Sequence, residues 1–287
     1  MLGKKFLTVI AWFCLCCSLV VAQESKTANA NLTAAQIVER NIAARGGLQA
    51  WRAVQAMSWT GKMDAGGGSL ERSRRVAEGR RERPNPTTVA TSKNAAADAN
   101  KQVQLPFVME MKRPGKSRVE IEFGGKTAVQ VFDGTNGWKV RPFLNRDDVQ
   151  PFTAEEAKSE STKAELDGPL VDYAAKGTKV ELEGVEKVEG RDAYKLKLTT
   201  KTSDVQHIWI DAENFLDVKV EGATRRMDGR MRTVWVYQRD FRSVQGVMIP
   251  FILETAVDGY RDTHKMVMQK VEVNPKLEDS LFTKPRA

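Results

Sequence analysis

Hydrophobic and polar residues alternate along residues 103–140, in short runs separated by Pro-Gly, Gly-Gly, Asp-Gly and Asn-Gly pairs. Because side chains alternate between the two faces of a strand, each run predicts a strand with one apolar and one polar face. The turn pairs predict tight connections, so the segment is expected to form an antiparallel meander. Its apolar row comprises Leu105, Phe107, Met109, Met111, Val119, Ile121, Phe123, Val129 and Val131.

The same alternation occurs before this segment and again after residue 180. Asp258-Gly259 is the clearest hairpin turn of the second region. About ten strands with a helical insertion in mid-chain predict one strongly curved antiparallel sheet, not a parallel α/β fold. The apolar rows of these other strands include Met57, Trp59, Leu196, Leu198, Ile208, Ile210 and Phe251.

Sequence signals for helices occur in two places. Thr33 is a predicted N-cap for a helix that carries an apolar stripe and ends at Gly46-Gly47, followed by one or two further turns. In mid-chain, Thr153 and Glu156 form a capping-box motif for a polar surface helix. The short apolar stretch 169–173 predicts a second, shorter helix there.

The first residues have the layout of a secretion signal. Lys4 and Lys5 precede an apolar run that ends at Ala22, which predicts a cleaved signal peptide at 1–22 and a single domain at 23–287. A lipoprotein anchor at one of the nearby cysteines is the less favoured alternative. Residues 79–101 are rich in Pro, Asn, Ala and charge without a period, which predicts a mobile insertion.

Composition excludes several kinds of site. All three cysteines lie within the predicted signal, so the domain has no disulfide framework, thiolate metal site or cysteine nucleophile. His207 and His264 have no second ligand at metal spacing, and no phosphate loop or dinucleotide fingerprint occurs. We therefore expect neither a metal nor a cofactor. The formal net charge of +8 is a mild basic bias.

Charged clusters leave two alternatives open. The arginines of segment 72–83 could contact phosphates, but acidic residues interrupt them and no aromatic residues for base stacking lie between them. A solvated loop is therefore favoured over contact with a lipid or a partner protein, and nucleic-acid binding is not expected. Glu120 with Glu122, on a polar strand face, and Asp147 with Asp148, in a loop, are paired carboxylates. Adjacency in sequence does not place such pairs across a cleft, so a hydrolase, with Asp211 or Glu213 as candidates, is disfavoured.

Several short motifs follow one another in a distinctive order. They are a signal peptide, a helix ending in Gly-Gly, Trp59-Thr60-Gly61, Lys112-Arg113-Pro114-Gly115-Lys116, Phe132-Asp133-Gly134, Gly137-Trp138, Val188 to Tyr194, Ile210-Asp211-Ala212-Glu213, and Val273-Asn274-Pro275 before Phe282. This order resembles the periplasmic outer-membrane lipoprotein-sorting carrier superfamily (LolA-like) across nearly all of residues 23–287. The resemblance implies a mainly β fold: an unclosed antiparallel barrel with helices as a lid in its concave face.

The resemblance also implies a function. Members hold acyl chains of lipoproteins or other amphiphiles in an apolar hollow, and the sixteen apolar residues named above are the candidate lining. The expected protein is a monomeric, periplasmic, non-enzymatic carrier that exchanges cargo with a membrane-bound donor or acceptor protein. The alternative is an envelope interaction or sensor module of the same fold, which docks a protein partner without carrying lipid.

Overall fold

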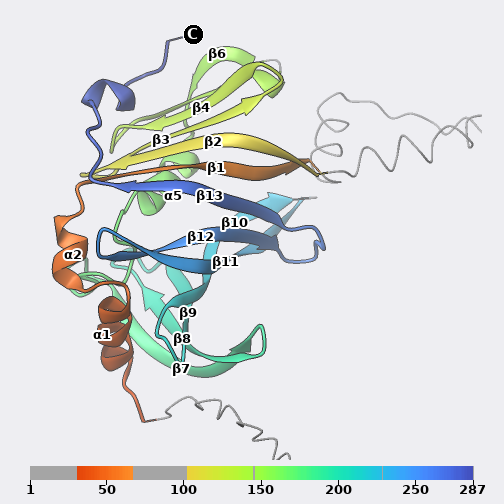
Figure 1. Ribbon diagram of the computed structural model, residues 1–287. Helices are drawn as coiled ribbons and strands as arrows, with labels where there is room; N and C mark the ends of the chain where they lie inside the picture. The colour runs from red at the N-terminus through yellow and green to blue at the C-terminus, as the bar shows by residue number, and fades with distance from the viewer. Residues whose placement is uncertain (1–30, 67–101, 145, 228, 287) are drawn as a thin grey trace, which may run out of the picture.

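The computed structural model describes residues 31–66, 102–144, 146–227 and 229–286 (Figure 1). Those residues contain one 13-stranded antiparallel sheet and the helices α1 (Ala34–Ala44), α2 (Leu48–Ala53) and α5 (Ala154–Lys163). The fold is mainly β, as the alternation predicted. The predicted signal peptide (1–22) and insertion (79–101) lie outside the described residues.

Neighbouring strands along the chain are neighbours in the sheet, except where β1 pairs with β13. The order is β6-β5-β4-β3-β2-β1-β13-β12-β11-β10-β9-β8-β7, so the first and last strands of the domain lie side by side at the centre. The strands are β1 (Ala56–Gly66), β2 (Gln102–Lys112), β3 (Lys116–Phe123), β4 (Lys126–Phe132), β5 (Gly137–Arg141), β6 (Arg146–Pro151), β7 (Lys179–Val188), β8 (Arg191–Thr199), β9 (Val205–Asp211), β10 (Asp217–Met227), β11 (Arg230–Val244), β12 (Val247–Val257) and β13 (His264–Val273).

The two edges of the sheet, β6 and β7, do not pair with each other, so the barrel is unclosed. The sequence predicted about ten strands, and β6 was missed because its short polar sequence has no apolar alternation. Asp147 and Asp148 therefore lie in an edge strand and not in a loop. Charged residues suit such an edge, since they oppose pairing with another chain.

Helix α5 shows how strongly the sheet bends. Ser117 Oγ of β3 donates to Glu160 Oε1 of α5 at 2.8 Å, while Lys158 Nζ pairs with Asp204 Oδ1 in the β8–β9 turn at 2.8 Å. These two contacts join parts of the sheet that are far apart in the strand order. The sheet must therefore curve around α5, which lies on its concave side (Figure 1).

The predicted caps form as their sequences require. Thr33 and Thr153 are the N-caps of α1 and α5, each in a capping box with the residue three positions on. In α5 that residue is Glu156, which also pairs with Lys139 of β5. Partial burial raises the pKa of the Glu156 carboxyl, but the hydrogen bonds from Lys139 Nζ and Thr153 N outweigh this, so its pKa lies below the ordinary value.

The short helix predicted at 169–173 is absent, and this stretch forms turns instead. Asp172 has φ of 52° and Gly168 has φ of 75°, both in the left-handed region, so no helix can pass through either position. The turns nevertheless bury Leu170 and Val171 completely. The apolar pattern of the stretch was real, but it reflects contact with the core and not helical periodicity.

Gly46 fixes the junction of α1 and α2 against the β11–β12 turn. Its φ is 110°, and a Cβ at this position would lie 2.1 Å from the carbonyl oxygen of Gly246. Gly47 has a similar φ of 91° but nothing within 4 Å of such a Cβ. An alanine would therefore strain the backbone at both positions, but only at Gly46 would its Cβ also clash with a neighbouring backbone atom.

We expect Gly46→Ala to lower the free energy of unfolding by about 2 kcal/mol more than Gly47→Ala, because overpacking against a backbone adds to the shared cost of a left-handed conformation. Urea denaturation of the two variants measures the difference. Equal losses would show that backbone conformation alone matters and that the α1–α2 junction can shift away from the β11–β12 turn.

Candidate functional site

The concave face of the sheet, which we call the helix-side face, carries most of the apolar side chains. A central cluster forms where α2 and the turns after α5 meet the middle strands. From the sheet it contains Met57, Trp59, Phe107, Met111, Val247, Ile249, Phe251, Met268 and Val273, and over them lie Trp51, Val54, Leu166 and Val171. The space above the central strands is therefore occupied by the protein's own side chains.

A second cluster lies under α1. Ile37 and Val38 of that helix, with Leu170, cover the helix-side faces of β8 and β9. Their sheet partners include Leu196, Leu198, Ile208 and Ile210, each at most 1% exposed. These four residues, which were predicted to line a hollow, instead pack in the hydrophobic core beneath α1.

Beyond the helices the helix-side face stays partly open. Met63 of β1 pairs with Leu105 of β2 on one side and with Met266 of β13 on the other, and Met266 pairs with Leu253 of β12. All four side chains are half-buried. They form an apolar row across four adjacent strands, roughly 14 Å long at about 4.8 Å per strand. We call it the half-buried row.

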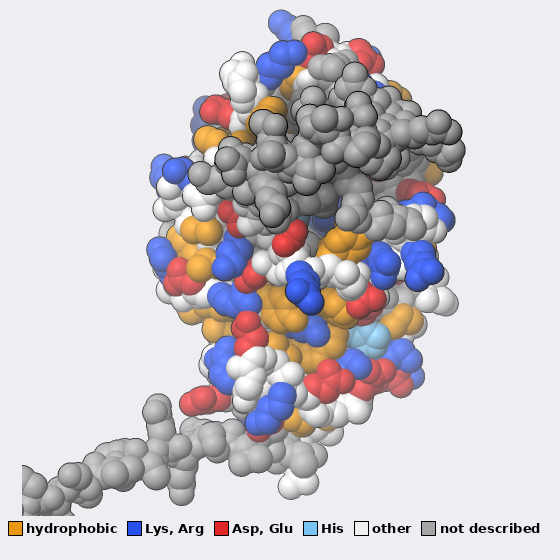
Figure 2. Space-filling model, turned by 90° about the vertical axis from the view of Figure 1, so that its right-hand side faces the viewer, with side chains coloured by type: hydrophobic (Ala, Val, Ile, Leu, Met, Phe, Trp, Pro, Cys, Tyr) orange, Lys and Arg blue, Asp and Glu red, His pale blue; other side chains and the backbone are white. Residues whose placement is uncertain are grey.

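Met109 and Ile121 continue this surface on β2 and β3. Both are half-buried and pack against the edge of the central cluster. The row lies near the strand ends opposite α1 and α2, and apolar side chains are exposed between charged ones on that side of the molecule (Figure 2). Methionine is flexible and polarisable, which suits a surface that adapts to different apolar partners.

The structure places the sixteen predicted residues in four settings. Met57, Trp59, Phe107, Met111 and Phe251 are in the central cluster, with Met109 and Ile121 at its edge. Leu196, Leu198, Ile208 and Ile210 are in the second cluster, and Leu105, Val119 and Phe123 share the helix-side face with less burial. Val129 and Val131 lie on the opposite face.

Val129 and Val131 were predicted on the wrong face, and they show how the length of a turn determines which face a side chain occupies. Phe123 pairs directly with Lys126, so the Gly124-Gly125 turn has two residues. Odd-numbered residues of β3 and even-numbered residues of β4 therefore lie on the same face of the sheet. Val129 accordingly lies beside Glu120 and not beside Ile121. The prediction that one parity continues through the whole meander was wrong at this turn. It held at the three-residue turn between β2 and β3.

Three residues of the half-buried row are absent from the sixteen. Met63, Leu253 and Met266 each sit in a strand that the sequence does predict, but only the pairing register brings them together with Leu105. A signal exists in principle, because Asp258-Gly259 marks the β12–β13 connection. That connection is longer than a tight hairpin, so the register across it could not be inferred.

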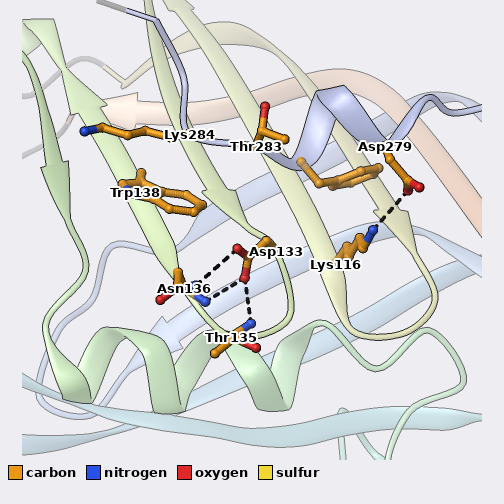
Figure 3. A pocket seen from close by; sticks show the side chains of 9 residues that line it. Lys116, Asp133, Thr135, Asn136, Trp138, Asp279, Thr283 and Lys284 are labelled. Carbon is orange, nitrogen blue, oxygen red and sulfur yellow. Dashed lines mark hydrogen bonds and ion pairs between the residues drawn. The ribbon is translucent and has the colours of Figure 1, made fainter.

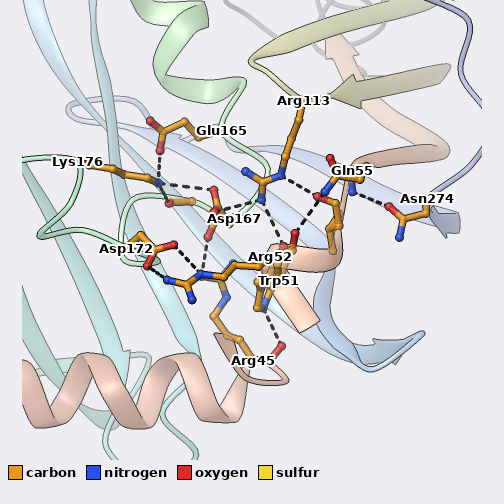
Figure 4. Close-up of polar contacts among 12 residues, drawn as sticks. Arg45, Trp51, Arg52, Gln55, Arg113, Glu165, Asp167, Asp172, Lys176 and Asn274 are labelled. Carbon is orange, nitrogen blue, oxygen red and sulfur yellow. Dashed lines mark hydrogen bonds and ion pairs between the residues drawn. The ribbon is translucent and has the colours of Figure 1, made fainter. Parts of the chain in front are cut away.

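Polar contacts hold α2 and the turns after α5 to the sheet (Figure 4). Arg113, in the β2–β3 turn, donates through Nε to the carbonyl oxygen of Val54 at 2.7 Å, and its Nη2 lies 3.2 Å from Asp167 Oδ2. The Asp167 side chain is only 7% exposed and is also 3.6 Å from Lys176 Nζ. The partly exposed Arg113 and the buried Asp167 thus connect three separate segments.

Arg45 links α1 to the same region. Its Nη1 donates to the carbonyl oxygen of Asp167 at 3.1 Å, and its guanidinium lies over the Trp51 ring at 4.4 Å. Trp51 Nε1 in turn donates to the carbonyl oxygen of Arg45 at 2.9 Å. The arginine therefore has both polar and ring partners although it is buried.

Two of the residues that the sequence singled out as candidates for chemistry, Asp211 and His207, have partners within the protein. No group of three or more His, Cys, Asp or Glu among them could hold a metal ion. Asp211 accepts from the backbone N–H groups of Glu213 and Asn214 and pairs with Arg191, so it caps a turn. His207 contacts Glu221 and Glu183. Within the described part of the chain, no helix is long and apolar enough to cross a membrane.

Comparisons with known proteins support the fold. A family model described only as an uncharacterized protein matches residues 171–286. No curated protein sequence matches the chain. A LolA superfamily protein from Nitrosomonas europaea is similar in structure: it is 16% identical, the match covers 88% of this chain and 98% of that protein, and the TM-score is 0.51.

Two further solved structures are similar over nearly the same length. A DUF1329 family protein from Desulfovibrio piger is 11% identical, with 87% of this chain and 97% of that one covered and a TM-score of 0.54. An outer membrane lipoprotein-sorting protein domain from Vibrio parahaemolyticus is 13% identical, with 89% and 98% covered and a TM-score of 0.53. The chain therefore has a LolA-like fold, as its motif order indicated.

Proposed function

We propose that the protein is an exported, periplasmic, non-enzymatic carrier that binds an acyl chain of a lipoprotein or another lipid on its helix-side face. The observation that supports this is the half-buried row, a continuous apolar surface that the helices leave partly open. The fold shared with a lipoprotein-sorting domain agrees with such a role. The proposal requires no catalytic group.

The energetics of transfer suit the dimensions of this surface. Moving one acyl chain through water exposes a dozen or so methylenes, which costs roughly 10 kcal/mol at about 0.8 kcal/mol each. A carrier offsets this cost by covering the chain with apolar side chains. The row spans roughly 14 Å, so it covers part of a long acyl chain, and Met109 with Ile121 extends the surface toward the central cluster.

The remainder of a long chain would have to enter beneath α2. Trp51 and Val54 occupy that space, and the polar contacts of Arg113 to Val54 and Asp167 hold them there. Binding of a full acyl chain is therefore coupled to movement of α2 in this proposal. The free energy of binding then includes the cost of breaking those contacts.

A second candidate function is a sensor or interaction module that docks a protein partner without carrying lipid. The filled central cluster favours it, because a module without cargo needs no hollow. The two candidates share the fold and the exported location and differ in whether apolar cargo is bound.

Native mass spectrometry distinguishes them. The purified protein is incubated with a bacterial phospholipid extract, desalted and sprayed under non-denaturing conditions. We expect adducts with the masses of one or two lipids, retained at collision energies that remove detergent. A protein that stays ligand-free over a range of lipid classes contradicts the carrier proposal and leaves the docking module. A protein of similar size without an apolar face serves as the control for nonspecific adducts.

A further inference from the structure

A hollow lies on the face of the sheet opposite the helices. It has a volume of about 480 Å³, within the range of small-molecule sites. Three segments that are distant in sequence form its walls: the start of β3, the β4–β5 turn with β5, and the chain after β13 (Figure 3). The lining residues are Lys116, Asp133, Thr135, Asn136, Trp138, Asp279, Phe282, Thr283 and Lys284.

The wall formed by the β4–β5 turn is fixed by its own hydrogen bonds. Asp133 Oδ1 accepts from the backbone N–H of Thr135 at 2.8 Å and of Asn136 at 2.6 Å. Partial burial raises the pKa of the Asp133 carboxyl, but these bonds outweigh it, so the pKa is below its ordinary value. The carboxylate is therefore ionised at neutral pH and holds the backbone of the turn through two hydrogen bonds.

The opposite wall is fixed by the C-terminal chain. Phe282 is 1% exposed, in the short helix η2 (Asp279–Phe282), and Arg118 of β3 donates to the carbonyl oxygen of Leu281 at 3.1 Å. Asp279 Oδ1 lies 3.0 Å from both Lys112 Nζ and Lys116 Nζ. These contacts hold η2 against the sheet, so the hollow exists without a ligand.

The charges of the lining select against ions. Two lysines and two aspartates line the hollow, so their formal charges cancel, and Lys116 is already paired with Asp279. A multivalent anion would face Asp133, and a cation would face Lys284, each at unfavourable Coulomb energy. The lining therefore favours a neutral ligand.

The polar groups of the lining both donate and accept. Ammonium, amide and indole N–H groups donate, whereas carboxylate and amide oxygens accept, with hydroxyls of Thr135 and Thr283 able to do either. Among the described residues, Trp138 Nε1 makes no hydrogen bond to the protein, and its half-buried ring is one side of the hollow (Figure 3). A matching ligand has hydroxyls for the polar wall and a C–H face for the ring.

We infer that this hollow binds a pyranose sugar unit, stacked on Trp138 and hydrogen-bonded by the β4–β5 turn. A sugar is neutral, its hydroxyls both donate and accept, and one face of its ring presents C–H groups. This site lies on the opposite face from the half-buried row, so it does not depend on the proposed acyl-chain binding. A protein with both sites would contact lipid and glycan independently.

Two-dimensional ¹H–¹⁵N NMR tests the inference. Cellobiose, maltose and di-N-acetylchitobiose are titrated into the ¹⁵N-labelled protein, and the indole Nε1–H signal of Trp138 is assigned by its loss in Trp138→Leu. We expect a saturable shift of that signal with at least one sugar, with Kd on the order of 1 mM. Trp138→Leu should weaken binding at least tenfold, monitored at the backbone signals of Thr135 and Asn136.

Trp235→Leu is the matched control, because Trp235 lies on the same face but in the other half of the sheet. It should leave sugar binding unchanged, and thermal melts verify that both variants fold. No saturable shift with any of the three sugars up to 100 mM would overturn the inference. So would equal binding by Trp138→Leu, or shifts at this site with inorganic phosphate and not with sugar.

Discussion

Aspartate in place of Ile121 is expected to abolish phospholipid binding while the protein remains folded. Ile121 is half-buried on the helix-side face, at the edge of the central cluster, where it pairs with Phe107 and Ala128. A carboxylate there would have to lose its water when an acyl chain covers it, at a cost of several kcal/mol. We expect at least a hundredfold loss of affinity, about 2.7 kcal/mol, in displacement of a fluorescent fatty acid.

Val129→Asp is the matched control for this experiment. Val129 is also half-buried, on the adjacent strand, but it faces the opposite side of the sheet beside Glu120. Its substitution should leave lipid affinity unchanged. Equal loss of binding by both variants would show that general destabilisation causes the effect, and normal binding by Ile121→Asp would exclude the helix-side face. Phe107→Asp is a poorer probe, because Phe107 is 2% exposed and its replacement would disrupt the core.

The sequence was sufficient to predict the architecture because most strands carry their own signal, with β6 as the exception. Alternation identified β2, β3, β8 and β9 and the faces of β2 and β3, and Gly-Gly, Pro-Gly and Asp-Gly pairs identified the turns between strands. Thr33 and Thr153 identified the starts of α1 and α5 from purely local capping chemistry. These features depend on residues that are close together in the chain.

The site depended on information that is not local. The face of Val129 is set by the number of residues in one turn, and the row of Met63, Met266 and Leu253 is set by pairing between the two ends of the domain. Likewise, alternation cannot tell whether an inward face is open or covered. Ile208 and Met63 both alternate, yet one is buried under α1 and the other is half-buried beyond the helices.

The same distinction explains why the sugar-site candidate was missed. Trp138 and Asp133 come from motifs that were recognised in the sequence, but the hollow forms only where the chain after β13 returns over β3 to β5. Phe282 and Asp279 lie more than 140 residues after Trp138 in the chain, about half its length. No periodicity within either segment indicates that they meet.

Asparagine in place of Asp167 is expected to lower the free energy of unfolding by about 2 kcal/mol, less than removing one partner of a fully buried ion pair costs, because the Arg113 side chain is 31% exposed. The substitution keeps the size of the side chain but removes the charge that faces Arg113 and Lys176. Arg113 is partly exposed, so water would screen its unpaired charge in part, and it would keep its hydrogen bond to the carbonyl oxygen of Val54. Guanidinium denaturation followed by tryptophan fluorescence measures the loss.

Asp172→Asn is the control, because its pair with Arg52 lies at the surface, where water screens both charges. Its stability should be close to that of the unchanged protein. If α2 moves to admit an acyl chain, Asp167→Asn should also speed the exchange of bound fatty acid, since it weakens the contacts that hold α2 and the turns after α5 together. Asp172→Asn should speed the exchange much less, because the pair that it removes, with Arg52 of α2, is exposed and contributes little. A destabilised Asp167→Asn protein with unchanged exchange would show that cargo enters without displacing α2, along the half-buried row alone.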